Sequence, residues 1–369
     1  MGVRELAQKA KDASVKLAVA SAKTRNNALL AMADALEAHA AEILAQNALD
    51  VQAAKQNGLK AAFVDRLTLN HARLDGMAGG LRKVALLPDP IGKSDNVLVR
   101  PNGLRIEKRR VPLGVIGIIF EARPNVTADA IALCVKSGNA CVLRGGKEAV
   151  RSNAAVCDCL NTAAVASGIP DGAIQLLRDT SREQAGEMMR LNGLIDVLIP
   201  RGGAGLIQSV VAQASVPVIE TGAGVCHVYI AQSADAGMAA DIVENAKCSR
   251  PSVCNAMETL LVHQAAAERT LPEICARLTK RGVELRCDER AKVLMPGAMD
   301  ASEAEWSAEY DDLILSVKVV DSFEEAVRHI GKYGTHHSDA IVTERYAEAE
   351  RFLNEVDSAA VYVNASTRF

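Results

Sequence analysis

The sequence predicts an α/β protein with two parallel-sheet domains and a separate antiparallel hairpin. After Val111, short continuous apolar runs alternate with helical patterns, and the alternation restarts after Gly224. Apolar strands separated by helices indicate sheets that are covered on both faces and joined by right-handed crossovers. The length of 369 residues also favours two or three domains.

The first ninety residues favour helices, because apolar residues recur there at three- and four-residue spacing. The clearest stripe consists of Leu29, Met32, Ala33, Leu36, Ala40 and Ile43. A hairpin is expected over 96–110, with a tight turn at Asn102-Gly103, since both residues tolerate positive φ. The hairpin ends in charges and has little to bury, which predicts an arm that packs on another domain or subunit.

The strands expected in the first sheet are 114–120, 140–144, 173–177, 195–199 and 216–220, with helices near 125–137, 148–167, 181–190 and 204–213. The strands expected in the second are 225–230, 258–263 and 313–320, with helices near 236–247, 265–281 and 322–331. The change between the two domains is placed near residues 220–224.

Composition and charge exclude several classes of protein. With 42 basic and 45 acidic residues and 3% aromatics, neither a nucleic-acid surface nor an anionic-membrane surface is expected. The N-terminal stretch has no apolar signal region, and the apolar run 111–120 is far shorter than the roughly 20 residues of a membrane helix. Nine cysteines without a CxxC pair give no zinc pattern. We therefore expect a cytoplasmic protein without a metal.

Two strand-to-helix turns predict a site for anionic ligands. Arg144 ends a strand, and Gly145-Gly146-Lys147 opens the next helix; Arg201-Gly202 repeats the pattern. Glycines let a ligand approach backbone N–H groups, and a helix N-terminus favours anions. Ligands usually bind at the carboxyl end of such a sheet. No GxGxxG fingerprint is present, and two ordinary turns with solvated basic residues are the alternative.

Cys254 is the candidate nucleophile. It lies in a polar, non-periodic segment just before an apolar strand, with Arg250 four residues away. An exposed, electropositive setting lowers the pKa of a thiol, and cysteine is intrinsically a strong nucleophile. A buried structural thiol is the alternative.

Two further polar features each allow two interpretations. Glu220 ends an apolar strand before Gly222 and Gly224 and could transfer protons if burial raised its pKa. A helix cap or an ion pair is the alternative for this carboxylate. His336 and His337 are adjacent but have no third ligand nearby, which favours a turn with hydrogen-bonding imidazoles over a metal site.

Four long motifs resemble the γ-glutamyl phosphate reductase family, a branch of the aldehyde dehydrogenase superfamily, and the resemblance covers essentially the whole chain. The motifs are residues 111–127, 137–149, 250–262 and 329–341. The resemblance implies an aldehyde dehydrogenase-like fold, with a cofactor-binding domain (1–95 and 111–222), an oligomerisation hairpin (96–110), a catalytic domain (223–355) and the start of a C-terminal oligomerisation segment (356–369). Because family members continue for several dozen residues, this last segment is expected to be truncated.

The resemblance also implies an activity: NADPH-dependent reduction of L-glutamate 5-phosphate to L-glutamate 5-semialdehyde in proline biosynthesis, with release of phosphate and a thioacyl intermediate on Cys254. The implied site residues are the catalytic Cys254, Asn125 and Glu220, the cofactor-binding Arg144, Gly145, Gly146, Lys147, Arg201, Gly202 and Glu309, and the substrate-binding Arg250. A lysine at 147 suits the 2′-phosphate of NADPH. Cys248 and Ser249 depart from the Thr-Gln expected before Arg250.

The partners implied by the resemblance are the acyl phosphate substrate and further copies of the chain, and an association with glutamate 5-kinase is left open. Two alternatives share the same fold. A hydrolytic or CoA-dependent aldehyde dehydrogenase would consume water or CoA instead of releasing phosphate. An inactive scaffold need not retain affinity for NADPH.

Overall fold

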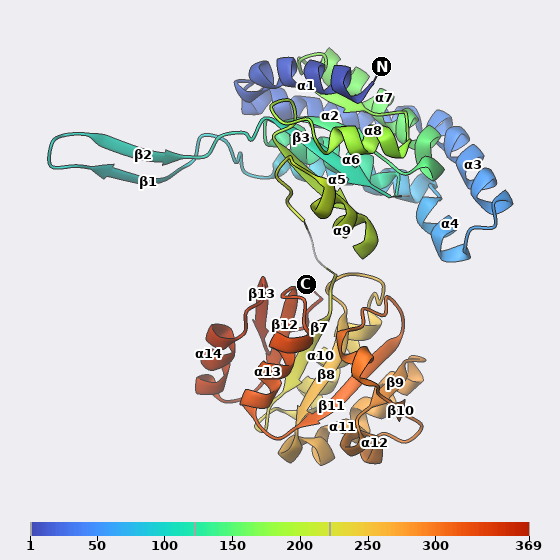
Figure 1. Ribbon diagram of the computed structural model, residues 1–369, viewed down its shortest axis with the longest axis vertical. Coiled ribbons are helices and arrows are strands. Elements are labelled where there is room, and N and C mark those ends of the chain that lie inside the picture. The colour runs from blue at the N-terminus through green and yellow to red at the C-terminus, as the bar shows by residue number, and fades with distance from the viewer. Residues whose placement is uncertain (1, 122, 221–222, 369) are drawn as a thin grey trace. The chain divides into compact units, whose positions relative to one another are not determined.

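The computed structural model describes residues 2–121, 123–220 and 223–368. The chain divides into two compact units, Met1–Thr221 and Gly222–Phe369 (Figure 1). Each unit contains its own parallel sheet, and the first also contains an antiparallel hairpin. The predicted α/β class is therefore confirmed.

The sheet of the first unit has the strand order β5-β4-β3-β6 and is parallel throughout. Its strands are β3 (Val115–Phe120), β4 (Ala140–Arg144), β5 (Ile174–Leu176) and β6 (Val197–Arg201). Every residue of β3 is buried, as expected for a central strand covered on both faces. The register sets Ile119 opposite both Arg144 and Pro200, so the carboxyl ends of β3, β4 and β6 share one edge.

The strand expected over 216–220 was wrong in extent. This segment forms only an isolated bridge between Leu198 and Val218. Pro217 accepts a hydrogen bond from the Leu198 N–H but has no N–H of its own to donate, which limits the pairing.

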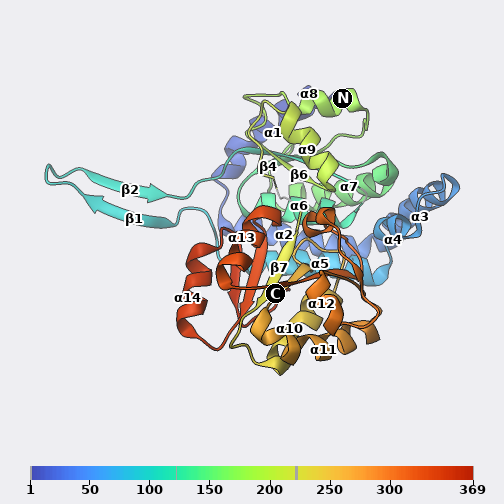
Figure 2. The ribbon, with the colours of Figure 1, turned by 60° about the horizontal axis from the view of Figure 1, so that its bottom comes forward.

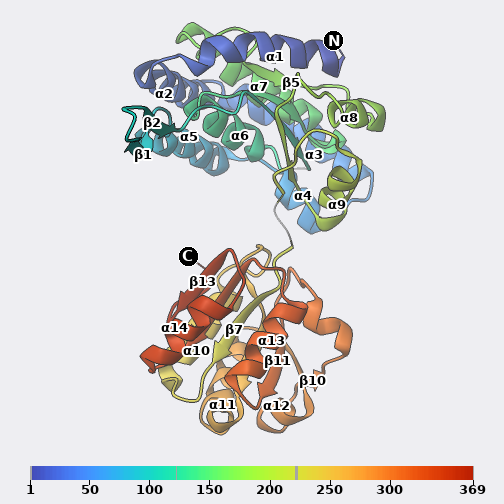
Figure 3. The ribbon, with the colours of Figure 1, turned by 60° about the vertical axis from the view of Figure 1, so that its left-hand side comes forward.

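The helices of the first unit pack around this sheet (Figure 3). They are α1 (Val3–Ala18), α2 (Ala22–Ala38), α3 (Ala40–Gln56), α4 (Ala61–Leu67), α5 (His71–Leu86), α6 (Asn125–Lys136), α7 (Val150–Ala166), α8 (Arg182–Met188) and α9 (Ala204–Gln213). Helices α1, α6 and α7 contact the strands directly, whereas α2 packs mainly on α5 and α7. The predicted apolar stripe is confirmed on α2, where Leu29, Met32, Ala33 and Leu36 are buried in the core.

The hairpin consists of β1 (Ser94–Val99) and β2 (Arg105–Arg109), which extend away from the rest of the first unit (Figure 1). Every residue of both strands is exposed. The expected hairpin is confirmed, and its turn contains Asn102-Gly103: the Gly103 N–H donates to the Arg100 carbonyl, and the Arg100 N–H donates to the Leu104 carbonyl, both at 2.8 Å. Only Gly103 of the Asn-Gly pair adopts a positive φ, of 83°.

The sheet of the second unit has the strand order β10-β9-β11-β8-β7-β12-β13 and is parallel. Its strands are β7 (Cys226–Ile230), β8 (Met257–His263), β9 (Glu284–Cys287), β10 (Met299–Asp300), β11 (Ile314–Val320), β12 (Ser338–Val342) and β13 (Ala360–Val363). Its α-helices are α10 (Ala236–Cys248), α11 (Gln264–Lys280), α12 (Glu289–Leu294), α13 (Phe323–Tyr333) and α14 (Tyr346–Glu355).

Both faces of the second sheet are covered, as Figure 2 shows. Alternate residues of β7 enter different cores: Val228 and Ile230 pack with α10, α11 and α12, whereas Tyr229 packs with α13 and α14. The sequence pattern did not predict four strands of this sheet, which are β9, β10, β12 and β13. No helix in the described ranges is long and apolar enough to cross a membrane.

Candidate active site

In the first unit, the predicted anion-binding residues gather at the carboxyl edge of the sheet. Arg144 ends β4, and its Nη2 donates to the Thr180 carbonyl at 2.7 Å. Burial lowers the pKa of Arg144, although the charges of Glu148 and Asp179 oppose the shift. The Nε–H of Arg144 is buried and has no partner among the described residues, so one donor is left for a ligand.

Because Gly145 has no side chain, the backbone of the turn can lie close to Asn153. A Cβ at this position would lie 2.1 Å from Nδ2 of Asn153, a buried side chain. That Asn153 nitrogen also lacks a hydrogen-bond partner within the described part of the chain. Lys147 begins the following helical turn and is exposed. Unsatisfied donors, two glycines and nearby cations fit the phosphate groups of a dinucleotide.

The second turn, after β6, is held by a residue that the sequence analysis missed. Glu121, directly after β3, accepts a hydrogen bond from the Gly203 N–H at 3.0 Å. A Cβ on Gly202 would lie 2.7 Å from the Glu121 carboxyl carbon, which explains the glycine. Arg201 is exposed beside this turn.

Asn125, the expected oxyanion donor, begins α6 in the same unit. Its Nδ2 donates to Asp129 Oδ2 at 3.3 Å. Burial raises the pKa of Asp129, while Asn125 and the charge of Arg201 lower it. The start of α6 and the turn after β6 therefore lie in one neighbourhood.

In the second unit, Cys254 lies in the turn 249–256 between α10 and β8. It is half-buried, whereas the other eight cysteines lie within or at the end of helices and strands. A Cβ on Gly224 would lie 1.5 Å from the Cys254 carbonyl oxygen, so only glycine fits beside the turn. The Cys226 thiol donates to the same carbonyl at 3.2 Å. The backbone of Cys254 is thus fixed from the β7 side.

His337 contacts the candidate nucleophile. Its hydrogen bond with Cys254 raises the pKa of His337 above its ordinary value; burial opposes the shift, and the charges of Glu309 and Asp339 support it. Its Nδ1 lies 2.8 Å from Ser338 Oγ and 3.9 Å from Cys226 Sγ. The predicted hydrogen-bonding turn is confirmed for His336, which contacts the Asp357 carbonyl, but the link from His337 to Cys254 was missed.

Strand order brings these residues together. Cys226 on β7 pairs with Met257 on β8, and Asp339 on β12 pairs with His227 on β7. The segments that precede β7, β8 and β12 therefore meet at the amino edge of the second sheet. This is the opposite strand polarity to the candidate site of the first unit.

A buried ion pair supports the two ends of the Cys254 turn. Lys247 Nζ, near the end of α10, lies 2.6 Å from Oε2 of Glu258 on β8, and both side chains are almost completely buried. Burial raises the pKa of Glu258 to about 8 and lowers that of Lys247, so both groups are driven toward their neutral forms. The Lys247 nitrogen also lies 5.8 Å from the centre of the Tyr310 ring.

Two of the remaining predicted residues, Arg250 and Glu309, lie in or beside the Cys254 turn. Arg250 is exposed within the Cys254 turn, and Glu220 is exposed near the end of the first unit. Glu309 accepts a hydrogen bond from the Gly224 N–H at 2.8 Å, so it lies beside the Cys254 turn. Gly222 is outside the described residues. No cluster of three metal-binding side chains occurs within the described ranges.

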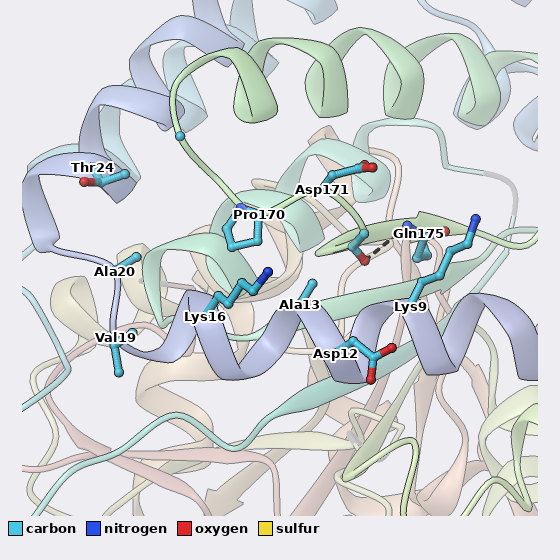
Figure 4. Close-up of a pocket in the computed structure, with 12 residues that line it drawn as sticks. Lys9, Asp12, Ala13, Lys16, Val19, Ala20, Thr24, Pro170, Asp171 and Gln175 are labelled. Carbon is cyan, nitrogen blue, oxygen red and sulfur yellow. Dashed lines mark hydrogen bonds between the residues drawn. The ribbon is translucent and has the colours of Figure 1, made fainter.

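An open cavity of about 960 Å³ lies at the other end of the first sheet, beside α1 and the segment that leads into β5 (Figure 4). Lys9, Asp12 and Lys16 line it from α1, Asp171 lines it from that segment, and Gln175 lines it from β5. None of the predicted site residues borders this cavity.

Comparisons with known proteins agree with this arrangement. A model of the aldehyde dehydrogenase family matches residues 1–311. The chain is 55% identical to a gamma-glutamyl phosphate reductase of Caldanaerobacter subterraneus subsp. tengcongensis, covering all of this chain and 89% of that protein.

Solved structures of gamma-glutamyl phosphate reductases also match the whole chain. A gamma-glutamyl phosphate reductase of Thermotoga maritima is 44% identical with a TM-score of 0.97, over all of this chain and 89% of that one. The corresponding Saccharomyces cerevisiae protein is 31% identical with a TM-score of 0.57, over all of this chain and 93% of that one. The chain therefore belongs to the aldehyde dehydrogenase family and, within it, to the gamma-glutamyl phosphate reductases.

Proposed function

We propose that the chain catalyses the NADPH-dependent reduction of L-glutamate 5-phosphate to L-glutamate 5-semialdehyde, with release of phosphate, the second step of proline biosynthesis from glutamate. The observation that carries this proposal is the position of Cys254, half-buried in a turn whose backbone is held by Gly224 and Cys226. The names of relatives that match the whole chain supply the substrate class.

Cys254 acts as the nucleophile. Its sulfur bonds to the acyl carbon, the bond from that carbon to the phosphate oxygen breaks, and a thioester remains on the enzyme. The backbone N–H of Cys254 and the side chain of Asn125 are the proposed donors to the oxyanion. When bound, NADPH would supply the hydride that reduces the acyl group to the aldehyde level.

The first unit, as the cofactor-binding domain of residues 1–95 and 111–222, would hold the dinucleotide at Arg144, Gly145, Gly146, Lys147, Arg201 and Gly202. The unsatisfied Nε–H of Arg144 and the exposed ammonium of Lys147 suit a 2′-phosphate, which favours NADPH over NADH. Glu309, beside the Cys254 turn, is the proposed contact to the nicotinamide ribose.

Two exposed charged residues complete the proposed site. Arg250, in the same turn as Cys254, would anchor the phosphate of the substrate. Glu220 would position or protonate a reacting group, since no water has to be activated in this reaction. The catalytic domain in this proposal spans residues 223–355.

Assembly and location are part of the same proposal. The hairpin 96–110 and the segment 356–369 would contact further copies of the chain, and the exposed side chains of Val97, Leu98, Val99 and Ile106 support this. An association with glutamate 5-kinase would protect the labile acyl phosphate, and a cytoplasmic location follows from a biosynthetic role.

The reverse reaction tests the proposal. NADP reduction by glutamate 5-semialdehyde should require phosphate and should be lost in Cys254→Ala. Turnover without phosphate would replace the proposal with a hydrolytic reaction in which Glu220 activates water. Loss of turnover in the intact protein, with NADPH binding retained, would also contradict it.

A further inference from the structure

We propose that His337 accepts the proton of the Cys254 thiol, so that the two side chains react as a thiolate–imidazolium pair. This inference rests on the proposed function, in which Cys254 is the nucleophile. The inference adds a second catalytic residue, His337, which directly precedes β12, to the nucleophile Cys254 in the turn before β8.

The first support is geometric. His337 and Cys254 come from different strand connections, and both contact the Cys226 thiol, which lies 3.9 Å from His337 Nδ1 and donates to the Cys254 carbonyl at 3.2 Å. The side chains of His337 and Cys254 also interact with each other. Ser338 Oγ lies 2.8 Å from Nδ1 of His337 and restrains the imidazole. On the other side, contact with Gly224 and the Cys226 thiol fixes the backbone of Cys254. Both partners are therefore held in place before a substrate arrives.

The second support is the surrounding charge. The titratable groups that act on His337 are Cys254 from the turn before β8, Cys226 on β7, Glu309 from the segment before β11, and Asp339 on β12. Two of them are carboxylates, which favour the protonated imidazole. Asp339 is fixed in place, because it accepts hydrogen bonds from the His227 backbone N–H at 2.8 Å and from the Ser358 hydroxyl.

The third support comes from helix polarity. Helices α10 and α13 both end shortly before the segments that carry Cys254 and His337. The C-terminal end of a helix carries partial negative charge, which favours a cation and gives a thiolate no help. A thiolate at this edge therefore gains more from nearby cations than from helix ends: the exposed Arg250 lies in the same turn, and His337 is the titratable side chain that contacts Cys254.

The proton balance of the step is simple. The thiol proton moves from Cys254 to His337, and the thiolate bonds to the acyl carbon. Phosphate leaves with the electron pair of the broken carbon–oxygen bond and takes up a proton from water. After reduction of the acyl group, the sulfur leaves with the electron pair of the carbon–sulfur bond, and the imidazolium stabilises the thiolate that is formed again.

The pH dependence of Cys254 alkylation tests the pair without any turnover. The rate of iodoacetamide labelling at Cys254, followed by mass spectrometry of its peptide, is measured from pH 5 to 10 for the wild type, His337→Asn and His336→Asn. Asparagine can still bond to Ser338, and His336→Asn is the matched control because His336 contacts Asp357 and tolerates the same replacement.

The wild type should keep a reactive thiolate well below the ordinary thiol pKa of about 8.5. In His337→Asn the inflection should move toward that value, with labelling at pH 6.5 slowed at least about 10-fold and kcat/KM reduced about 100-fold or more. The control variant should match the wild type in both measurements.

A wild-type inflection near the ordinary thiol pKa would overturn the inference, even if His337→Asn failed to fold. The same holds for an unchanged labelling profile in a folded His337→Asn. If the labelling shift is observed but the wild type does not reduce NADP with glutamate 5-semialdehyde and phosphate, the pair stands and the proposed function fails.

Discussion

The two candidate sites occupy opposite edges of their sheets. In the first unit the residues follow the carboxyl ends of β3, β4 and β6, where helix N-termini and glycine turns offer N–H donors. In the second unit they precede β7, β8 and β12, where helices end. The polarity of the parallel strands thus makes one edge suitable for binding anions. At the other edge, charge must come from side chains such as His337.

The largest effect is expected from removing the nucleophile at the amino edge. Cys254→Ser should lower phosphate-dependent NADP reduction by about 10⁴-fold or more, because the hydroxyl is a far weaker nucleophile at neutral pH. The dissociation constant for NADPH, measured by fluorescence titration, should not change. Cys248→Ser, six residues earlier, is the matched control and should retain activity; equal losses in both variants would contradict the assignment.

A backbone clash at the same edge should have the next largest effect. Gly224→Ala places a Cβ where the Cys254 carbonyl oxygen lies, so the turn must shift. A displacement of about 1 Å can cost about 100-fold in turnover. We expect kcat to fall by that order while NADPH affinity is retained. Gly331→Ala on α13, where the Cβ meets nothing within 4 Å, should leave kcat unchanged.

A substitution at the carboxyl edge of the first sheet should change the affinity for the dinucleotide and not the rate of the chemical step. Lys147→Ala removes an exposed cation beside the Gly145-Gly146 turn and should weaken NADPH about 10-fold, with little effect on NADH. Titration with both dinucleotides gives the ratio. Lys83→Ala, which removes an exposed lysine on α5, is the control; loss of NADH affinity to the same extent would argue against a 2′-phosphate contact.

The smallest expected effect is on the pH dependence of the free energy of unfolding. The pKa of Glu258 is raised to about 8, so the folded state binds more protons than the unfolded state between about pH 4.5 and 8. This group therefore makes the free energy of unfolding fall as pH rises through that window, by at most about 1.4 kcal/mol per pH unit. The lowered pKa of Lys247 acts in the opposite direction at higher pH, below the ordinary lysine pKa of about 10.4.

Glu258→Gln keeps the size of the side chain and removes its titration. Denaturant unfolding of the second unit at pH 5, 6.5 and 8 should then show a weaker fall with pH than in the wild type. A slope identical in the two proteins would mean that Glu258 is ionised throughout this range.

The sequence was most informative where a local pattern determines the structure. The glycines and cations of 144–147 mark a turn between strand and helix, and the polar segment around Cys254 interrupts two regular elements. Both were placed correctly for this reason. Strand β12 was missed because Ser338 and Asp339 interrupt its apolar run; Asp339 is buried and paired with the His227 ring.

Long-range partners could not be predicted in the same way. His337 contacts Cys254 only because β7 lies between β8 and β12, a strand order that no local pattern specifies. Glu121 contacts Gly203 because β3 and β6 are neighbours, although they are separated in sequence by two other strands. The adjacent histidines suggested hydrogen bonding, but the identity of the partner depended on the sheet.

The β1–β2 hairpin depends on contact with another surface for its stability. A two-stranded ribbon whose residues are all exposed has no core and is marginally stable in water. Its amide protons should therefore exchange rapidly in dilute solution and slowly when another surface covers Val97, Leu98 and Ile106. The exchange rate in this ribbon would then depend on protein concentration, while exchange in the cores of the two units would not.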